Sequence, residues 1–102
     1  MPFSLTNKVA LVTGSSRGLG RGIALALGKA GAKVCLNYLN NPESAQKTLQ
    51  DLRNGGIHAT MFRADASDTD QINSMVEAIE EKFGSLDILV PNATPDQPQK
   101  PI

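Results

Sequence analysis

Val9-Ala-Leu-Val-Thr-Gly-Ser-Ser-Arg-Gly-Leu-Gly-Arg-Gly22 is the stretch that decides the fold of this chain. An apolar run typical of a buried strand leads, through a turn containing Gly14, Gly18 and Gly20, into an amphipathic helix. Glycines in such a turn allow a tight reversal, a close approach of the backbone to a ligand, and close packing of the helix on its strand. The start of the helix offers unpaired N–H groups and a partial positive charge. The segment therefore predicts an anion site, with the pyrophosphate of a dinucleotide as the expected ligand.

The glycine spacing distinguishes between families of nucleotide-binding proteins. Thr13 and the three glycines form Thr-Gly-x-x-x-Gly-x-Gly, which differs from the Gly-x-Gly-x-x-Gly of many dehydrogenases and lacks the Lys-Ser or Lys-Thr of a P-loop. The pattern resembles the short-chain dehydrogenase/reductase family, and the resemblance runs from about Lys8 to Thr94. The alternative is a strand-to-helix turn that binds nothing. The resemblance implies a bound nicotinamide dinucleotide and, for the parent enzyme, reversible reduction of a small carbonyl compound or oxidation of an alcohol.

Apolar segments alternate with helical periodicity, which favours successive βαβ units and a parallel sheet. We expect strands over about 9–13, 33–38, 59–64 and 88–90, and helices over about 17–29, 42–54 and 68–83. Right-handed crossovers then give a Rossmann-like, doubly wound α/β fold with strand order 3-2-1-4, incomplete on one face. The residues expected to face inward are Leu19, Ile23, Ala26, Leu27 and Ala30 in the first helix, Ala45, Thr48, Leu49 and Leu52 in the second, and Ile72, Met75, Val76, Ile79 and Phe83 in the third.

The end of the second strand indicates which dinucleotide is preferred. An acid there would bind the ribose hydroxyls of NAD and repel the extra phosphate of NADP. Residues 36–41 contain no carboxylate, and Tyr38 stands where NAD-preferring members of the family carry aspartate. Arg17 in the glycine turn can supply a charge-assisted hydrogen bond to a 2′-phosphate. We therefore predict NADP rather than NAD, the alternative being that Arg17 is a solvated turn residue.

Two acids match the family at other strand ends. Asp65-Ala66, directly after the third strand, resembles a pair whose aspartate accepts a hydrogen bond from the adenine amine. An Asx turn or a helix cap is the alternative role for Asp65. Asp87 resembles the acid before the fourth strand, which steadies the sheet beside the adenine pocket, and we interpret it as structural.

The segment after the fourth strand matches the family only in part. Where the family carries Asn-Asn-Ala-Gly, this chain has Pro91-Asn92-Ala93-Thr94. Pro91 removes a backbone donor, and Thr94 adds a branched side chain where glycine lets the ribose pass. The expected cofactor-binding residues are Gly14, Ser16, Arg17, Gly18, Leu19, Gly20, Tyr38, Asp65, Ala66, Asn92 and Ala93.

Composition excludes several classes of partner. Ten basic and ten acidic residues cancel, which favours neither a nucleic-acid nor a membrane-surface partner, and no apolar run approaches the about 20 residues of a membrane span. The first residues do not form a secretion signal, so we expect a cytoplasmic protein. Cys35 is expected to be a buried strand residue, and the single His58 has no ligand cluster around it, so no metal site is expected.

The family's catalytic groups, a serine and a Tyr-x-x-x-Lys pair, have no counterpart here, because the only tyrosine, Tyr38, is followed four positions later by Pro42. We therefore predict no catalytic residue in this chain. Residues 1–94 are interpreted as the dinucleotide-binding half of a truncated reductase and 95–102 as an extended, proline-rich tail leading to an absent carboxyl-terminal half. The alternative is a non-catalytic dinucleotide-binding or interaction module. Because one sheet face would be poorly covered, we expect the chain to be marginally stable or to self-associate.

Overall fold

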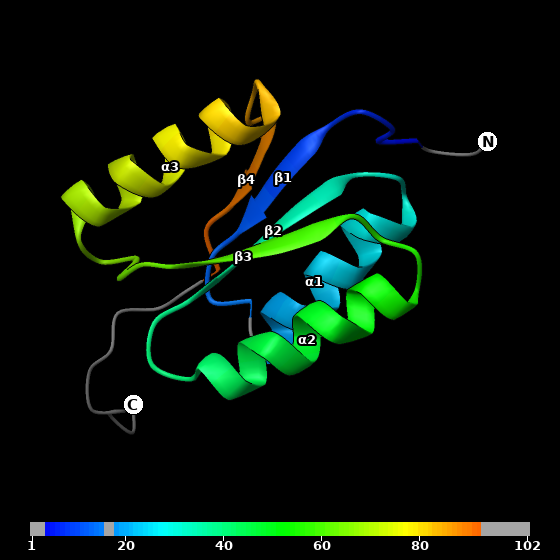
Figure 1. Ribbon diagram of the computed structural model, residues 1–102, viewed down its shortest axis with the longest axis horizontal. Helices are drawn as coiled ribbons and strands as arrows, with labels where there is room; N and C mark the ends of the chain where they lie inside the picture. Colours follow the sequence, from blue (N-terminus) through cyan, green and yellow to red (C-terminus); the bar gives the residue numbers. More distant parts are fainter. Residues whose placement is uncertain (1–3, 16–17, 93–102) are drawn as a thin grey trace, which may run out of the picture.

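The described part of the protein is built on one parallel four-stranded sheet. The computed structural model describes residues 4–15 and 18–92. Its strands are β1 (Val9–Val12), β2 (Lys33–Tyr38), β3 (Ala59–Arg63) and β4 (Ile88–Val90). They lie in the order β3-β2-β1-β4 (Figure 1), with Leu11 opposite both Cys35 and Leu89. The expected strand order is confirmed.

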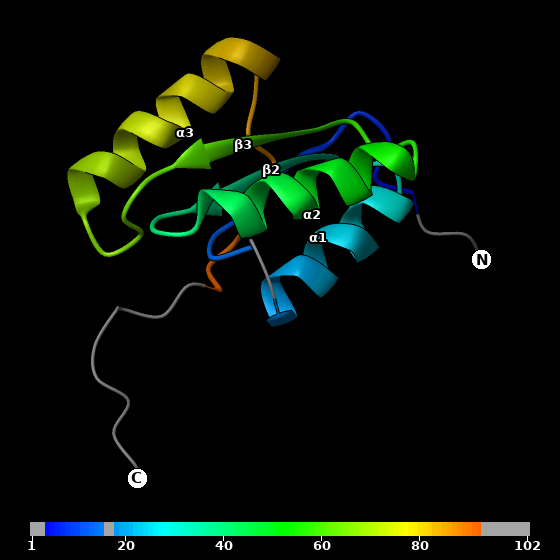
Figure 2. The same ribbon diagram turned by 60° about the horizontal axis from the view of Figure 1, so that its bottom comes forward.

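Three helices connect the strands and lie on both faces of the sheet. Helices α1 (Gly18–Lys29) and α2 (Pro42–Asn54) cover one face, and α3 (Thr69–Phe83) covers the other (Figure 2). This arrangement follows from right-handed crossovers, because two units wind one way from β1 and the third returns to its other side. The direction of winding therefore reverses between β1 and β4.

Alternate strand residues supply a separate core to each face. Val12, Val34 and Leu36 pack with residues of α1 and α2, whereas Val9, Leu11 and Cys35 pack with residues of α3. Strands β1 and β2 are nearly apolar because both of their faces are covered. All four predicted inward residues of α2 are buried, and Met75 and Ile79 form the buried centre of the predicted α3 stripe.

The predicted inner face of α1 is wrong in two positions. Leu19 is 74% exposed and Ala26 is also exposed, whereas Gly20 and Ala24 are the buried residues of this helix. Small residues let the helix axis approach the sheet more closely than leucine would, and the close approach rotates α1 relative to its hydrophobic pattern. Ile23 and Leu27 still pack against the core at the edges of the buried face.

Side chains and a glycine cap the ends of α2 and α3. The Oδ1 atom of Asn41 accepts from Ser44 N at 3.0 Å, and Gly84 ends α3 with a left-handed φ of 90°. Asp68 caps α3 through Asp70 N and Gln71 N. Asp68 N donates to the Asp65 carbonyl at 2.9 Å, and Gln71 Nε2 donates to Asp68 Oδ2 at 3.2 Å.

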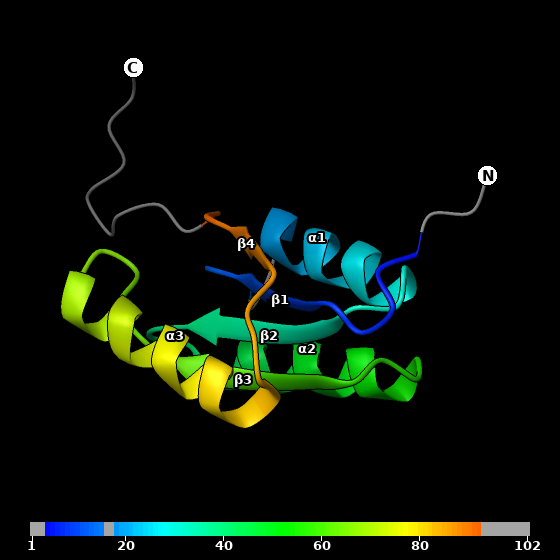
Figure 3. The same cartoon turned by 90° about the horizontal axis from the view of Figure 1, so that it is seen from above.

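One side of the sheet remains partly uncovered. Seen from above, no helix of the described chain lies in front of β4 (Figure 3), and Leu89 is 52% exposed. Within residues 4–15 and 18–92, none of the helices combines the length and the apolar character needed to cross a bilayer.

Candidate dinucleotide-binding site

The glycine turn lies at the carboxyl end of β1, where the winding of the sheet reverses. Gly14 and Gly18 adopt left-handed φ values of 62° and 63°, which side-chain-bearing residues rarely adopt. Helix α1 begins at Gly18, so its amino end faces the same edge of the sheet. Ser16 and Arg17 of the predicted site lie outside the described residues. A turn of this shape at a switch point is where α/β proteins bind ligands.

Gly20 lets α1 start in close contact with the turn. A Cβ atom built on Gly20 would collide with the Gly14 carbonyl oxygen and would come within 2.6 Å of Asn92 Nδ2 and 2.9 Å of Ser15 Cα. Only glycine fits this contact without moving backbone. The third glycine of the motif is therefore explained by packing of the helix against the turn, as the sequence predicted.

Asn92 ties the segment after β4 to the glycine turn. Its Nδ2 donates to the Gly14 carbonyl oxygen at 3.1 Å, and its backbone N donates to Thr13 Oγ1 at 2.9 Å. The preceding Val90 carbonyl accepts from Thr13 N at 3.1 Å. Because these bonds use Val90 and Asn92, the donor that Pro91 lacks is not required at this junction. Ala93, also predicted for the site, lies outside the described residues.

Asn37 is a buried polar residue whose role sequence analysis missed. Its Oδ1 accepts from Gly14 N at 3.0 Å, and its Nδ2 donates to Ala64 O at 3.1 Å. Its backbone exchanges two hydrogen bonds with Ser15, donating to Oγ at 2.9 Å and accepting from N at 3.0 Å. This one side chain therefore connects the glycine turn to the end of β3. A single amide within an otherwise apolar, doubly covered strand was the available clue, because buried polar groups require partners.

Tyr38 and Asp65 lie at the carboxyl ends of neighbouring strands. Tyr38 is half-buried, and its carbonyl accepts from Ala64 N at 3.0 Å. Asp65 Oδ1 accepts from Ser67 N at 2.9 Å and from Ser67 Oγ at 2.6 Å, and these bonds hold the pKa of Asp65 below its usual value. Asp65 therefore forms an Asx turn, while its predicted contact with adenine stays a prediction. Ala66, next in the chain, is half-buried.

Asp87 lies at the amino ends of the strands, whereas the glycine turn lies at their carboxyl ends. Its Oδ2 accepts from Val9 N at 2.9 Å and from Ser85 Oγ at 3.1 Å, at the amino ends of β1 and β4. These bonds, with the charge of Lys8, lower the pKa of Asp87. The structural role is confirmed, but its predicted place beside the adenine pocket is wrong, because the residue precedes its strand rather than following it.

Cys35 and His58 were the remaining reactive groups in the sequence. Burial raises the pKa of the Cys35 thiol to about 12, so the group packs as a small apolar residue in the described core. The His58 ring lies edge-to-face against Phe83 at 5.8 Å between centroids. Among the described residues, no three His, Cys, Asp or Glu side chains cluster closely enough to hold a metal ion.

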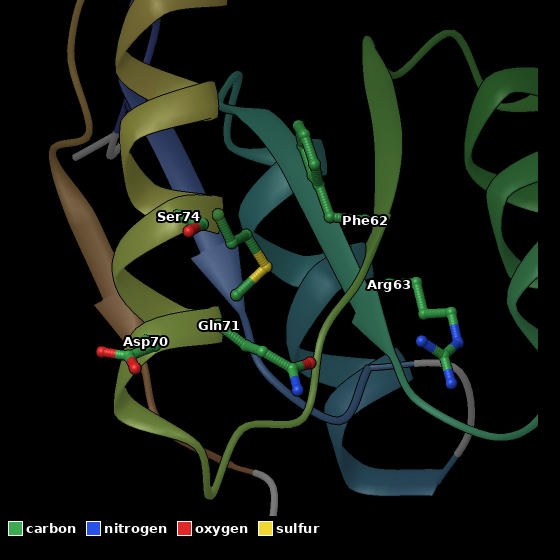
Figure 4. Close-up of a pocket in the computed structure, with 6 residues that line it drawn as sticks. Phe62, Arg63, Asp70, Gln71 and Ser74 are labelled. Carbon is green, nitrogen blue, oxygen red and sulfur yellow. The ribbon is translucent and has the colours of Figure 1, made fainter.

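A hollow of about 350 Å³ opens between the end of β3 and the first turns of α3 (Figure 4). Its lining residues are Phe62, Arg63, Asp70, Gln71, Ser74 and Met75. None of the predicted cofactor-binding residues belongs to this lining.

The fold and the turn together define a class. A parallel sheet in the order β3-β2-β1-β4, with a glycine turn and a helix start at its switch point, is the architecture of a dinucleotide-binding α/β protein. The chain belongs to the short chain dehydrogenase family, which it matches over residues 8–102. Members of this family are oxidoreductases that bind nicotinamide dinucleotides.

Individual relatives agree with this assignment. Versicolorin reductase stcU of Emericella nidulans is 44% identical over 91 residues, which are 89% of this chain and 34% of that protein. A dehydrogenase/reductase from Sinorhizobium meliloti 1021 superposes with a TM-score of 0.86 at 41% identity, covering 90% of this chain and 36% of the other. A short chain dehydrogenase from Burkholderia cenocepacia J2315, solved in complex with NADP, gives 0.82 at 42% identity, covering 87% and 36%. The chain thus spans about a third of the length of the relatives it matches.

Proposed function

We propose that this chain is the cofactor-binding part of an NADP-preferring oxidoreductase that interconverts small carbonyl compounds and alcohols. The observation that carries the proposal is the contact of Gly20 with Gly14 and Asn92, because it directs the start of α1 at the edge where the strands end. Exposed N–H groups and the helix dipole favour a diphosphate at that place. When bound, the nicotinamide would supply or accept the hydride.

The other predicted residues surround the same edge in roles that remain proposals. Asp65 Oδ2 would accept a hydrogen bond from the adenine amine. Ser67 already donates to Oδ1, and no hydrogen bond reaches Oδ2 from the described residues. Tyr38, Ala66 and Leu19 would line the adenosine and nicotinamide ends of the cofactor. The 74% exposure of Leu19 supports this role, since an apolar side chain in the first turn of α1 is then available for contact.

The preference for NADP over NAD is supported by charge at the end of β2. Residues 36–41 bear no carboxylate that would repel a 2′-phosphate, and Arg17 in the glycine turn would bind it. The NADP complex of the Burkholderia relative favours the same choice for this chain.

Calorimetric titration with NADPH and with NADH tests the proposal. We expect NADPH to bind at least about tenfold more tightly, which corresponds to about 1.4 kcal/mol. Arg17→Ala should weaken NADPH more than NADH, and equal weakening would contradict the phosphate-binding role of Arg17. Failure to bind either nucleotide, or a soaked crystal with an empty glycine turn, would refute the dinucleotide site itself.

The second candidate function is a dinucleotide-binding module without chemistry. It needs only the glycine turn and the shared strand ends that residues 4–15 and 18–92 provide. The transcript distinguishes the two functions: reading in frame past the codon for Ile102 into a serine and a Tyr-x-x-x-Lys segment supports the reductase. A stop codon at that point, with NADPH still bound, supports the module.

A further inference from the structure

We infer that Arg63, the last residue of β3, is a cation of this site that recognises the 2′-phosphate of NADP. The inference rests on the NADP preference proposed above. It assigns a specificity-determining role to a residue that the glycine motif does not contain. Three observations carry it: the register of Arg63 in the sheet, the hydrogen bond that orients it, and the charge around it.

The register places Arg63 beside the position that discriminates between the two dinucleotides. Arg63 is the pairing partner of Tyr38 in the parallel ladder between β2 and β3. Register partners on adjacent strands lie about 4.8 Å apart and point to the same face of the sheet. The arginine is therefore a neighbour of Tyr38 at the carboxyl edge, where a dinucleotide ribose would lie.

A hydrogen bond aims the side chain at the segment after β2. Arg63 Nε donates to the carbonyl of Leu39, the residue after Tyr38, at 3.1 Å. Figure 4 shows the Arg63 side chain leaving the end of β3 on the side away from the labelled residues of α3. This bond uses one of the five N–H donors of a guanidinium, so the two terminal nitrogens stay available for a bidentate acceptor such as phosphate.

No described carboxylate forms an ion pair with Arg63. The one ion pair within residues 4–15 and 18–92 joins Arg21 to Asp51, so no carboxylate of that part pairs with Arg63. Arg63 is exposed, and residues 36–41 contain no acid. An unpaired cation at this edge favours the dianionic 2′-phosphate and leaves the uncharged ribose hydroxyl of NAD unaffected.

A purely structural role for Arg63 would be to cap the Leu39 carbonyl. The fold offers a direct comparison, because Arg53 donates from Nε and Nη2 to the Ala59 carbonyl at 3.1 and 3.0 Å. Ala59 is the first residue of β3, so Arg53 caps a carbonyl at the opposite end of the strand that Arg63 ends. Arg53→Gln is therefore a matched control, since it removes the same charge and a similar carbonyl cap far from the proposed phosphate.

The test compares ligands that differ only in the 2′-phosphate. Wild type, Arg63→Gln, Arg63→Lys and Arg53→Gln are titrated with NADPH and NADH, and with adenosine 2′,5′-bisphosphate and 5′-AMP. We expect Arg63→Gln to weaken the two 2′-phosphorylated ligands by about five- to tenfold and the others by less than about twofold. Arg63→Lys should retain part of the preference, and Arg53→Gln should retain all of it.

Each outcome decides one question. If wild type prefers NADPH and Arg63→Gln leaves the NADPH-to-NADH affinity ratio unchanged, the assignment of Arg63 is overturned while the proposed function stands. A ratio near one in wild type refutes the NADP preference itself. Thermal melts identify any variant that fails to fold. An Arg63→Gln protein that unfolds and loses affinity for all four ligands together would show that Arg63 only caps the Leu39 carbonyl, which overturns the assignment.

Discussion

Replacing Gly20 by alanine measures how tightly α1 is pressed against the glycine turn. Gly20 has a negative φ, so alanine meets no backbone restriction there, but its Cβ would lie 2.6 Å from Asn92 Nδ2 and 2.9 Å from Ser15 Cα. Either the helix or the turn must move. Gly22 provides the matched control, because a Cβ at that exposed position of the same helix meets nothing within 4 Å.

The two substitutions share one energetic contribution and differ in another. Each exchanges glycine for alanine inside a helix, which stabilises the fold by about 1 kcal/mol. Gly20→Ala adds an overpacking cost of about 1–3 kcal/mol. We therefore expect Gly22→Ala to be about 1 kcal/mol more stable than wild type, and Gly20→Ala to be about 1–3 kcal/mol less stable than Gly22→Ala.

Urea unfolding monitored by circular dichroism measures this difference, and NADPH titration adds a functional measurement. Movement of the turn would displace the Gly14 carbonyl and the amide of Asn92, so we expect NADPH affinity to fall at least about tenfold in Gly20→Ala. Affinity should stay within about twofold of wild type in Gly22→Ala. Equal unfolding free energies for the two variants would refute the steric argument, whatever the nucleotide affinities.

Three further predictions concern residues outside α1. Asn37→Leu should cost about 3 kcal/mol or more in urea unfolding, because it leaves the Gly14 N–H and a carbonyl of the β3 end without a buried partner; a cost under about 1 kcal/mol would contradict the network. The depressed pKa of Asp87 means that its carboxylate stabilises the fold fully above about pH 4 and loses this effect as the pH falls through the lower folded value. Asp87→Asn should therefore flatten the acid side of the melting-temperature profile, and an unchanged slope would exclude that contribution. Leu89 is exposed on the edge strand, so we expect the chain to associate as its concentration rises. Leu89→Lys should return it to a monomer in sedimentation experiments. A cooperative melt of a monomeric wild-type chain would contradict this prediction.

Regular elements were predictable wherever one local rule determined them. The inner face of α2 follows from apolar spacing alone, and its start follows from Asn41 and Pro42, because capping needs only neighbouring residues. The inner face of α1 was not predictable in the same way. Its position is set by how closely Gly20 and Ala24 allow the helix to approach the sheet, and a hydrophobic pattern carries no information on that distance.

The site residues, too, were predictable where local geometry determines them and not where distant partners do. The glycine motif predicted the turn because each glycine meets a local geometric need, and the parallel topology predicted which strand ends share an edge. Asn37 escaped prediction because its partners, Gly14 and Ala64, lie 23 and 27 residues away in the chain. Asp65 forms its Asx turn as one local rule allowed, while its contact with adenine stays a prediction.

Hydrogen bonds fix both the N–H and the carbonyl of Gly14 in the nucleotide-free fold. The N–H donates to Asn37 on β2, and the carbonyl accepts from Asn92 beyond β4. Glycine loses more conformational entropy on ordering than any other residue. At Gly14 this loss occurs when the protein folds, not when the nucleotide binds. Encounter with a nucleotide then requires little rearrangement at Gly14, so preorganisation here should raise affinity by lowering the ordering cost of the complex.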